Sequence, residues 1–181
     1  MFKHLTITAF VAAALVHPRP AAAGAAAFET YGDISQYAIP GIAMLFTMAR
    51  GDPEGLVQLG ASTAATFGTV QGVKRAVDRE RPGGGGLSFP SGHTSGAFSG
   101  ASYLHYRYGW EYGLPAYLAA AAVGYSRVEA DKHYWSDVAV GAAIANLSAF
   151  LLDDPINERI TVLPMLDIRK PSFGIVASIR F

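Results

Sequence analysis

Five long stretches without a charged residue dominate this chain of 181 residues. They cover residues 34–49, 55–73, 82–106, 112–126 and 138–152. Charged residues make up 15% of the sequence and apolar residues 51%, whereas an ordinary soluble domain is about 25% charged. The chain must therefore bury much of its length in one domain or contact lipid, and general disorder is excluded.

Signals that begin and end helices separate these stretches. Gly51 can end one helix, and Asp52-Pro53-Glu54 combines an N-cap, a first-turn proline and a first-turn acid. Arg81-Pro82 ends the second helix, because proline disfavours helical geometry in the residue before it. The predicted helices cover residues 34–49, 53–80, 92–108, 114–126 and 134–152.

The C-terminal tail has a different period. Residues 173–181 alternate between large apolar and smaller or polar side chains, and residues 160–168 do so less regularly. Such alternation is typical of half-buried strands, so we expect the tail to form a short β-hairpin packed on the helices.

Together with the five predicted helices, this gives a mainly α fold: an antiparallel bundle of about five helices with a short C-terminal β-hairpin.

The first 23 residues are typical of a secretory signal peptide. Lys3 precedes an uncharged run, residues 5–16, and Ala21-Ala22-Ala23 offers a small-x-small cleavage site. As a helix this run would be about 18 Å long, against a hydrocarbon core of roughly 30 Å. We expect a signal peptide (1–23), a helical domain (24–152) and a tail (153–181). We also expect the protein to be exported to the bacterial cell envelope, with its active site facing the periplasm. The alternative is a disordered alanine-rich leader.

Overall charge and cysteine content exclude several functions. Lys plus Arg and Asp plus Glu are matched at 14 each, so there is no net positive field for nucleic acid. The absence of cysteine excludes disulfides, a thiolate nucleophile and a cysteine-type zinc site. Recognition by charge must therefore be local.

Residues able to perform chemistry occur in three segments, 74–81, 91–93 and 127–137. If consecutive helices run antiparallel, all three fall at the same end of the bundle. They contain three cations, two histidines, a carboxylate and a helix start: Lys74, Arg81, Arg127, His93, His133, Asp137, Ser91 and Gly92. Taken singly, these are ordinary features: a solvated helix end, a surface His/Asp pair or metal ligands, and a capped helix start.

Together the residues suit phosphoryl transfer. On a helix, His133 and Asp137 share a face, and a carboxylate on one imidazole nitrogen leaves the other as a base or nucleophile. Three cations suit the equatorial oxygens of a phosphoryl group. Ser91-Gly92 adds a hydroxyl and backbone N–H groups at a helix start, and His93 is then free to protonate a leaving alcohol.

The three segments read Lys74-x6-Arg81-Pro82, Pro90-Ser91-Gly92-His93 and Ser126-Arg127-x5-His133-x3-Asp137. This pattern closely resembles the three-part signature of the type 2 phosphatidic acid phosphatase (PAP2) family, and the helix pattern extends the resemblance to residues 34–152. The resemblance implies hydrolysis of a phosphate monoester or diphosphate through a phosphohistidine, without a metal or other cofactor. It implies His133 as nucleophile, Asp137 as its orienting group, His93 as general acid, and Lys74, Arg81, Ser91, Gly92 and Arg127 as phosphate contacts.

Two other functions remain open. The pattern also resembles that of vanadium-dependent haloperoxidases, because vanadate is a phosphate analogue that the same cations and histidine can bind. Those enzymes are several times longer than this chain. A catalytically inactive, membrane-associated binding protein is the third interpretation, although no signature residue is missing.

The substrate is less constrained than the reaction. PAP2 enzymes act on lipid phosphates, undecaprenyl diphosphate, lipid A or soluble monoesters, so we expect a phosphorylated lipid or small phosphate ester and membrane association. The spacer 83–89 is short for the family, which leaves less room for a substrate lid. Uncharged stretches near fifteen residues make about 22 Å of helix, short of a full span. A small periplasmic or peripherally embedded enzyme therefore fits slightly better than a polytopic one.

Overall fold

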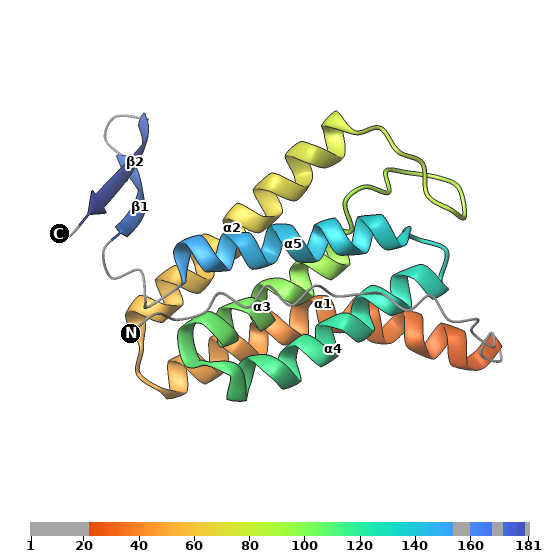
Figure 1. Ribbon diagram of the computed structural model, residues 1–181, viewed down its shortest axis with the longest axis horizontal. Helices are drawn as coiled ribbons and strands as arrows, with labels where there is room; N and C mark the ends of the chain where they lie inside the picture. The colour runs from red at the N-terminus through yellow and green to blue at the C-terminus, as the bar shows by residue number, and fades with distance from the viewer. Residues whose placement is uncertain (1–21, 154–159, 168–171, 180–181) are drawn as a thin grey trace, which may run out of the picture.

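The computed structural model describes residues 22–153, 160–167 and 172–179. Its helices are α1 (Ala22–Ala49), α2 (Pro53–Ala76), α3 (Gly92–Tyr108), α4 (Trp110–Glu129) and α5 (Trp135–Leu152). They run back and forth along one axis (Figure 1), so the predicted antiparallel bundle is confirmed. Most of the predicted signal peptide lies outside the described residues.

Helix α3 is the centre of the bundle and contacts all four other helices. Its buried positions are mostly small residues, which lets its neighbours approach closely. A Cβ added to Gly100 would lie 2.5 Å from the Cα atom of Pro40 in α1. Ser95 and Ser99 donate to carbonyl oxygens three residues earlier in α3, which satisfies hydroxyl groups that would otherwise be costly to enclose.

The turn between α3 and α4 is shorter than the sequence predicted. Gly109 alone separates the two helices, with a φ of 97° that a residue with a side chain rarely adopts. Helix α4 therefore starts at Trp110 rather than at residue 114, and Pro115 lies inside it. Helix α1 likewise starts at Ala22, well before the predicted residue 34.

Helix α2 ends at Ala76 rather than at residue 80. The backbone beyond it pairs across the following loop instead: Glu80 forms a β-bridge with Leu87, and the Ser88 N–H donates to the Arg79 carbonyl at 2.7 Å. The glycines at 84–86 all have positive φ and make this tight return possible. Arg81, predicted to follow directly on a helix that ends at residue 80, therefore lies within the loop instead.

Two strands follow the helices, β1 (Ile160–Asp167) and β2 (Ser172–Ile179). They pair antiparallel with each other, from Ile160 opposite Ile179 to Asp167 opposite Ser172. The expectation that a hairpin packs on the helices is not supported.

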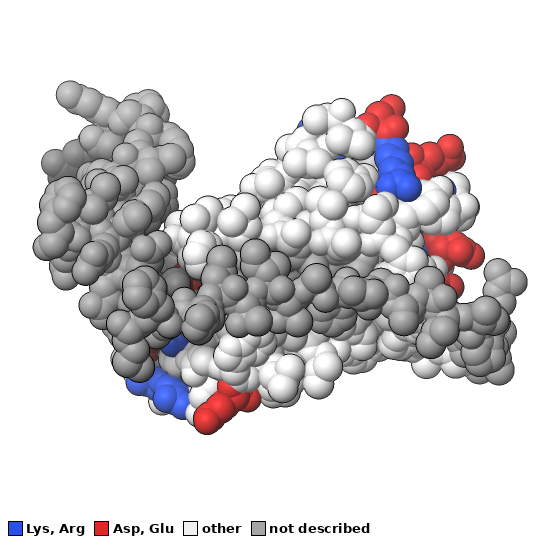
Figure 2. Space-filling model, viewed as in Figure 1, with Lys and Arg blue, Asp and Glu red and all other residues white. Residues whose placement is uncertain are grey.

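Charged side chains gather at the two ends of the bundle, and Figure 2 shows an almost uncharged surface between them. We use the name apolar belt for the exposed apolar side chains of this middle part: Ile34, Tyr37, Ile42, Leu45, Met48, Leu118, Leu147, Phe150 and Leu151. By length and composition, one helix of the described residues, α5, could cross a membrane.

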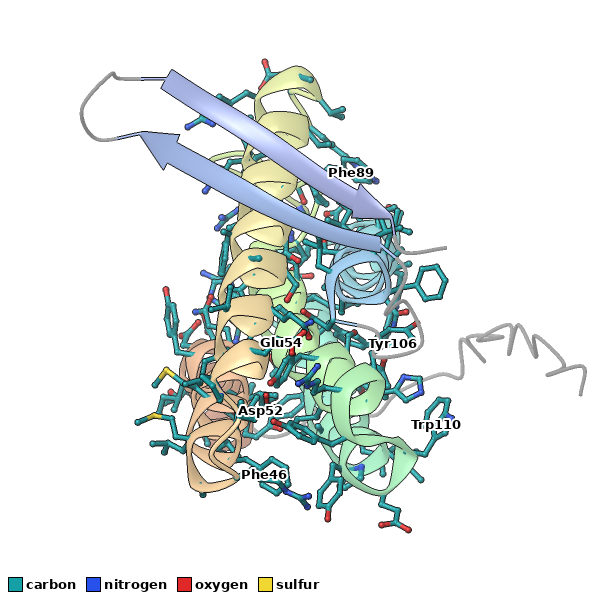
Figure 3. All side chains as sticks on the ribbon, turned by 90° about the vertical axis from the view of Figure 1, so that its left-hand side faces the viewer. Phe46, Asp52, Glu54, Phe89, Tyr106 and Trp110 are labelled. Atoms are coloured by element: carbon teal, nitrogen blue, oxygen red, sulfur yellow. The ribbon has the colours of Figure 1, made fainter. Side chains whose placement is uncertain are left out.

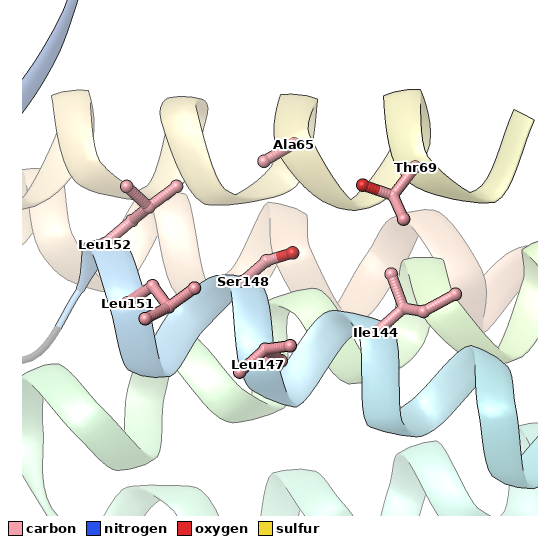
Figure 4. A pocket seen from close by; sticks show the side chains of 7 residues that line it. All are labelled: Ala65, Thr69, Ile144, Leu147, Ser148, Leu151 and Leu152. Carbon is pink, nitrogen blue, oxygen red and sulfur yellow. The ribbon is translucent and has the colours of Figure 1, made fainter. Parts of the chain in front are cut away.

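A groove of about 260 Å³ runs between α2 and α5 within this middle part (Figure 4). Its lining is mostly apolar and consists of Ala65, Thr69, Ile144, Leu147, Ser148, Leu151 and Leu152. The groove and the apolar belt therefore lie on the same uncharged part of the surface.

Candidate active site

Two backbone hydrogen bonds join the three segments that carry the predicted site residues. The Ser91 N–H donates to the Asp137 carbonyl at 3.0 Å, which holds the start of α3 against the start of α5. The Gly83 N–H donates to the Asp131 carbonyl at 2.9 Å, which holds the loop after α2 against the turn between α4 and α5. The segments therefore meet at one end of the bundle, as the sequence predicted.

His133 and Asp137 are both buried, with 3% and 0% of their side chains exposed. Imidazole Nδ1 lies 3.5 Å from Asp137 Oδ2. The same carboxylate accepts the Tyr134 N–H at 2.9 Å and so caps α5, accepts the Ser88 hydroxyl, and meets Arg79 Nη1 at 3.0 Å. Asp137 is thus held by donors from the start of α5 and from two points of the loop between α2 and α3.

The pKa of His133 is lowered to about 4, mainly by burial and then by the charges of Lys74 and Arg81. The Asp137 carboxylate acts in the opposite direction and offsets part of this effect. The imidazole is therefore neutral at physiological pH, and because Nδ1 faces the carboxylate, Nε2 is the nitrogen available for nucleophilic attack.

Lys74 and Arg81 approach this imidazole from α2 and its following loop. Lys74 Nζ donates to the carbonyl oxygens of Leu87 (3.1 Å) and Ser88 (3.4 Å), and burial lowers its pKa. Arg81 Nε is buried and has no hydrogen-bond partner among the described residues. A buried donor without an acceptor is uncommon, so Arg81 has hydrogen-bonding capacity for an anionic ligand.

Arg127 and His93 converge on Asp33, a residue of α1 that lies outside the three predicted segments. Arg127, only 2% exposed, donates from Nη1 to Asp33 Oδ1 at 2.6 Å and from Nη2 to the Glu29 carbonyl. His93 Nε2 lies 3.0 Å from the same Asp33 oxygen. Asp33 is therefore a member of the site that sequence reasoning missed, because no motif links it to residues some 60 and 94 positions away.

Burial and the Arg127 charge lower the pKa of His93, whereas Asp33 raises it. The protonation of this second histidine therefore depends on how strongly Asp33 offsets the neighbouring guanidinium. An anion bound between the cations would act in the same direction as Asp33.

The start of α3 presents a hydroxyl and backbone N–H groups. Ser91 caps the helix, and its Oγ accepts from the N–H and the hydroxyl of Thr94. Gly92 is the first residue of the helix, and a Cβ added there would meet no atom within 4 Å. Open space therefore adjoins a helix N-terminus, which favours anions.

The site thus combines a neutral buried imidazole, a second histidine, cations and a helix start. Among residues 22–153, no group of three or more His, Asp or Glu side chains is arranged to hold a metal ion. The arrangement suits nucleophilic attack on a phosphoryl group whose oxygens are neutralised by side-chain cations.

Comparison with known proteins agrees with this chemistry. The PAP2 superfamily model matches residues 83–153. A lipid A 4'-phosphatase of Helicobacter pylori is 34% identical over 140 residues, which cover 71% of this chain and 70% of that protein. The chain belongs to the PAP2 superfamily. The resemblance noted in the sequence is therefore confirmed, and the chain is a phosphoric ester hydrolase.

Two further relatives of this PAP2 protein are informative. A lipid A 1-phosphatase of Porphyromonas gingivalis is 38% identical over 97 residues, which are 51% of this chain and 22% of that protein. The crystal structure of Aquifex aeolicus LpxE superposes with a TM-score of 0.62 at 22% identity, over 73% of this chain and 86% of that one. The structural match supports the helical PAP2 fold.

Proposed function

We propose that this protein is a metal-independent phosphatase that acts on a phosphorylated lipid through a phosphohistidine on His133. The observation that carries the proposal is the state of His133: it is buried, neutral, oriented by Asp137 and close to the charges of Lys74 and Arg81. A neutral imidazole beside two cations is suited to attack a phosphoryl group, because the cations neutralise the anionic substrate that would otherwise repel a nucleophile.

In the first step, the Nε2 lone pair of His133 attacks phosphorus and forms an N–P bond while the P–O bond to the leaving alcohol breaks. Protonated His93 donates its proton to the leaving oxygen. Lys74, Arg81 and Arg127 bind the equatorial oxygens, and Ser91 with the N–H of Gly92 supplies further hydrogen bonds. Asp137 stabilises the positive charge that develops on the imidazole.

In the second step, water replaces the alcohol. Neutral His93 removes a proton from the water as its oxygen attacks phosphorus, and the N–P bond breaks. Inorganic phosphate leaves, His133 is again neutral and His93 is again protonated. Each turnover therefore consumes one water and releases one phosphate and one alcohol.

A phosphorylated lipid is the substrate class that two observations favour. The identified relatives include a lipid A 4'-phosphatase and a lipid A 1-phosphatase. The apolar belt lies on α1, α4 and α5 between the two charged ends of the bundle (Figure 2), so a membrane at the level of the belt would leave the site at the level of lipid head groups. We propose export and a periplasmic site on the basis of the leader sequence.

The test uses the purified full chain in detergent with a chelator present. Phosphate release is measured from lipid A, phosphatidic acid, a prenyl diphosphate and a small aryl phosphate. Wild-type protein should release phosphate from at least one lipid far faster than from the aryl ester, and His133→Ala should lose at least about a thousandfold in kcat. Retained activity in His133→Ala, or a strict need for added metal, would contradict the mechanism.

Trapping the intermediate gives a direct readout. Brief exposure to a lipid substrate labelled on phosphorus should leave acid-labile, base-stable label on wild-type protein and none on His133→Ala. Peroxide-dependent bromination after addition of vanadate, with no phosphate release, would instead indicate the haloperoxidase alternative. Binding of lipid with neither reaction would indicate a binding protein.

A further inference from the structure

The Ser88 hydroxyl lies between the two residues that the proposed mechanism depends on most. Ser88 belongs to the loop that precedes α3 and is fully buried. Its Oγ donates to Asp137 Oδ2 and lies 3.5 Å from His133 Nδ1. No part of the three-segment pattern in the sequence includes this residue.

The direct contact between His133 and Asp137 is long. Nδ1 lies 3.5 Å from both Asp137 Oδ2 and Ser88 Oγ, whereas good N–H···O hydrogen bonds span about 2.7–3.2 Å. The carboxylate is thus no nearer to the imidazole than the hydroxyl is, and the hydroxyl is itself bonded to the carboxylate. A hydroxyl carries one proton, and the proton of Ser88 is directed at the carboxylate. The Ser88 oxygen is consequently an acceptor toward the imidazole, which favours the tautomer with hydrogen on Nδ1.

We propose that Ser88 is a positioning residue for the nucleophile, forming a relay from the His133 Nδ1–H through the Ser88 hydroxyl to Asp137. The relay holds Nε2 unprotonated and fixes the orientation of the ring. It also lets the carboxylate stabilise the imidazolium that forms with the N–P bond, because the Ser88 dipole is already aligned between the two groups. This inference rests on the proposed role of His133.

The backbone of Ser88 is held independently of its hydroxyl. Its N–H donates to the Arg79 carbonyl at 2.7 Å, and its own carbonyl accepts from Lys74 at 3.4 Å. Removing the hydroxyl should therefore leave the loop and the Lys74 contact in place, and Ser88→Ala isolates the relay.

The experiment compares Ser88→Ala with Ser88→Thr, which keeps a hydroxyl, and with Ser136→Ala. Ser136 is a matched control because it is close in space and accepts from Arg79 (2.8 Å) without contacting His133. We expect Ser88→Ala to lower kcat about 10- to 100-fold with little change in KM, the scale expected for one hydrogen bond to a charged group. Ser88→Thr should recover part of this loss, and Ser136→Ala should match the wild type.

Nitrogen-15 NMR of the histidine side chains provides a readout that does not depend on turnover. In the wild type, Nδ1 of His133 should resonate as a protonated nitrogen and Nε2 as an unprotonated one, and Ser88→Ala should shift this tautomer ratio. Wild-type kcat together with an unchanged tautomer signal in Ser88→Ala would overturn the relay. If His133→Ala keeps activity, the proposed function fails, whereas the tautomer measurement still decides whether the relay exists.

Discussion

One oxygen atom of Asp33 connects the two groups that would handle the leaving group and the phosphate. It accepts from Arg127 at 2.6 Å and lies 3.0 Å from His93 Nε2. Burial and the Arg127 charge lower the pKa of His93, and Asp33 raises it. The Asp33 carboxylate therefore favours the protonated form of the general acid in the proposed mechanism.

Replacing Asp33 by Asn should impair leaving-group protonation. The pKa of His93 should fall, because the raising influence is lost, and less of the residue is then protonated at pH 7. We expect kcat for an alkyl phosphate to drop about tenfold or more, with a much smaller loss for a nitrophenyl phosphate, whose leaving group needs no proton. Steady-state kinetics on both substrates measures this difference.

Asp131→Asn is the matched control, because Asp131 lies at the same end of the bundle and its backbone carbonyl, not its side chain, bonds to Gly83. Its positive φ of 52° is one that Asn also tolerates. Equal losses on the two substrates in Asp33→Asn would show that Asp33 acts on binding or folding instead of on the acid.

The sequence identified the residues whose chemistry is local and missed those that depend on distant contacts. His133 and Asp137 are four residues apart, and Ser91 begins a helix with a recognisable cap, so local spacing pointed to both features. The two side chains do not share a helix face as expected, however, because His133 precedes α5, which begins at Trp135. Asp33 reaches Arg127 only because α1 begins at Ala22 and crosses the end of α4. Ser88 meets Asp137 only because α2 ends early and the loop folds back. No local pattern encodes either contact.

At the scale of elements, α5 must lie unusually close to the start of α3. A Cβ added to Gly141 would be 2.6 Å from the Ser91 carbonyl oxygen, a backbone atom that cannot move without disturbing the cap of α3. The Ser91 N–H bonds to the Asp137 carbonyl in the same contact. The glycine therefore sets the distance between the helix that carries Asp137 and the helix that carries His93.

Gly141→Ala should lower both stability and activity. We expect a loss of about 1–3 kcal/mol in the free energy of unfolding, the usual cost of overpacking, and a lower kcat because α5 shifts relative to Ser91. Gly60→Ala is the control: a Cβ there meets nothing within 4 Å, so higher helix propensity should stabilise α2 by up to about 1 kcal/mol. Denaturant unfolding and kinetics of both variants test this, and a Gly141→Ala protein as stable and active as Gly60→Ala would refute it.

The other end of α5 carries a buried acid. Asp153 is fully buried, and neither carboxylate oxygen has a hydrogen-bond partner among the described residues. Burial raises its pKa from 3.8 to about 8, although Ser62 and Arg107 act in the opposite direction. The folded protein thus keeps a proton on Asp153 that the unfolded chain has lost.

Because the folded pKa is the higher one, Asp153 should make stability fall as pH rises from about 4 to about 8. Asp153→Asn should remove this slope and be more stable than the wild type at pH 8, by on the order of a few kcal/mol. Unfolding curves measured across this range decide the matter. Glu111→Gln, an exposed change at the same end, should keep the wild-type slope; a wild-type slope in Asp153→Asn would contradict the prediction.

At the scale of the whole molecule, the charged residues are concentrated at the two ends of the bundle (Figure 2), although the net charge is zero. The candidate active site occupies one end, and a second ionic cluster occupies the other. There Arg107 pairs with Asp52, the N-cap of α2, at 2.8 Å. Figure 3 looks onto this second end, where Asp52 and Phe46 are labelled. The low charged fraction of the sequence thus reflects the uncharged surface between the ends as well as the buried core.

Such a distribution predicts how the molecule sits in lipid. The chain contains no cysteine, so a spin label on a single introduced cysteine reports one position. With the protein in lipid vesicles, labels at Leu45, Leu118 and Leu147 of the apolar belt should be relaxed by oxygen dissolved in the bilayer. Labels at Glu54 and Asp131, at opposite ends, should instead be relaxed by a water-soluble nickel complex.

Belt and end positions must be compared, because a hydrophobic core and a lipid-facing surface can have the same composition. They differ in exposure: side chains of a core are buried within the protein, whereas those of a lipid-facing surface are not. Leu118 is 66% exposed and Leu45 61%, so in water each would leave a large apolar area uncovered, which a soluble monomer rarely does over a contiguous surface. Belt labels as accessible to nickel as the end labels would show that water covers this surface. The substrate would then have to leave its membrane to reach His133, and a soluble phosphate ester would replace a lipid as the better candidate.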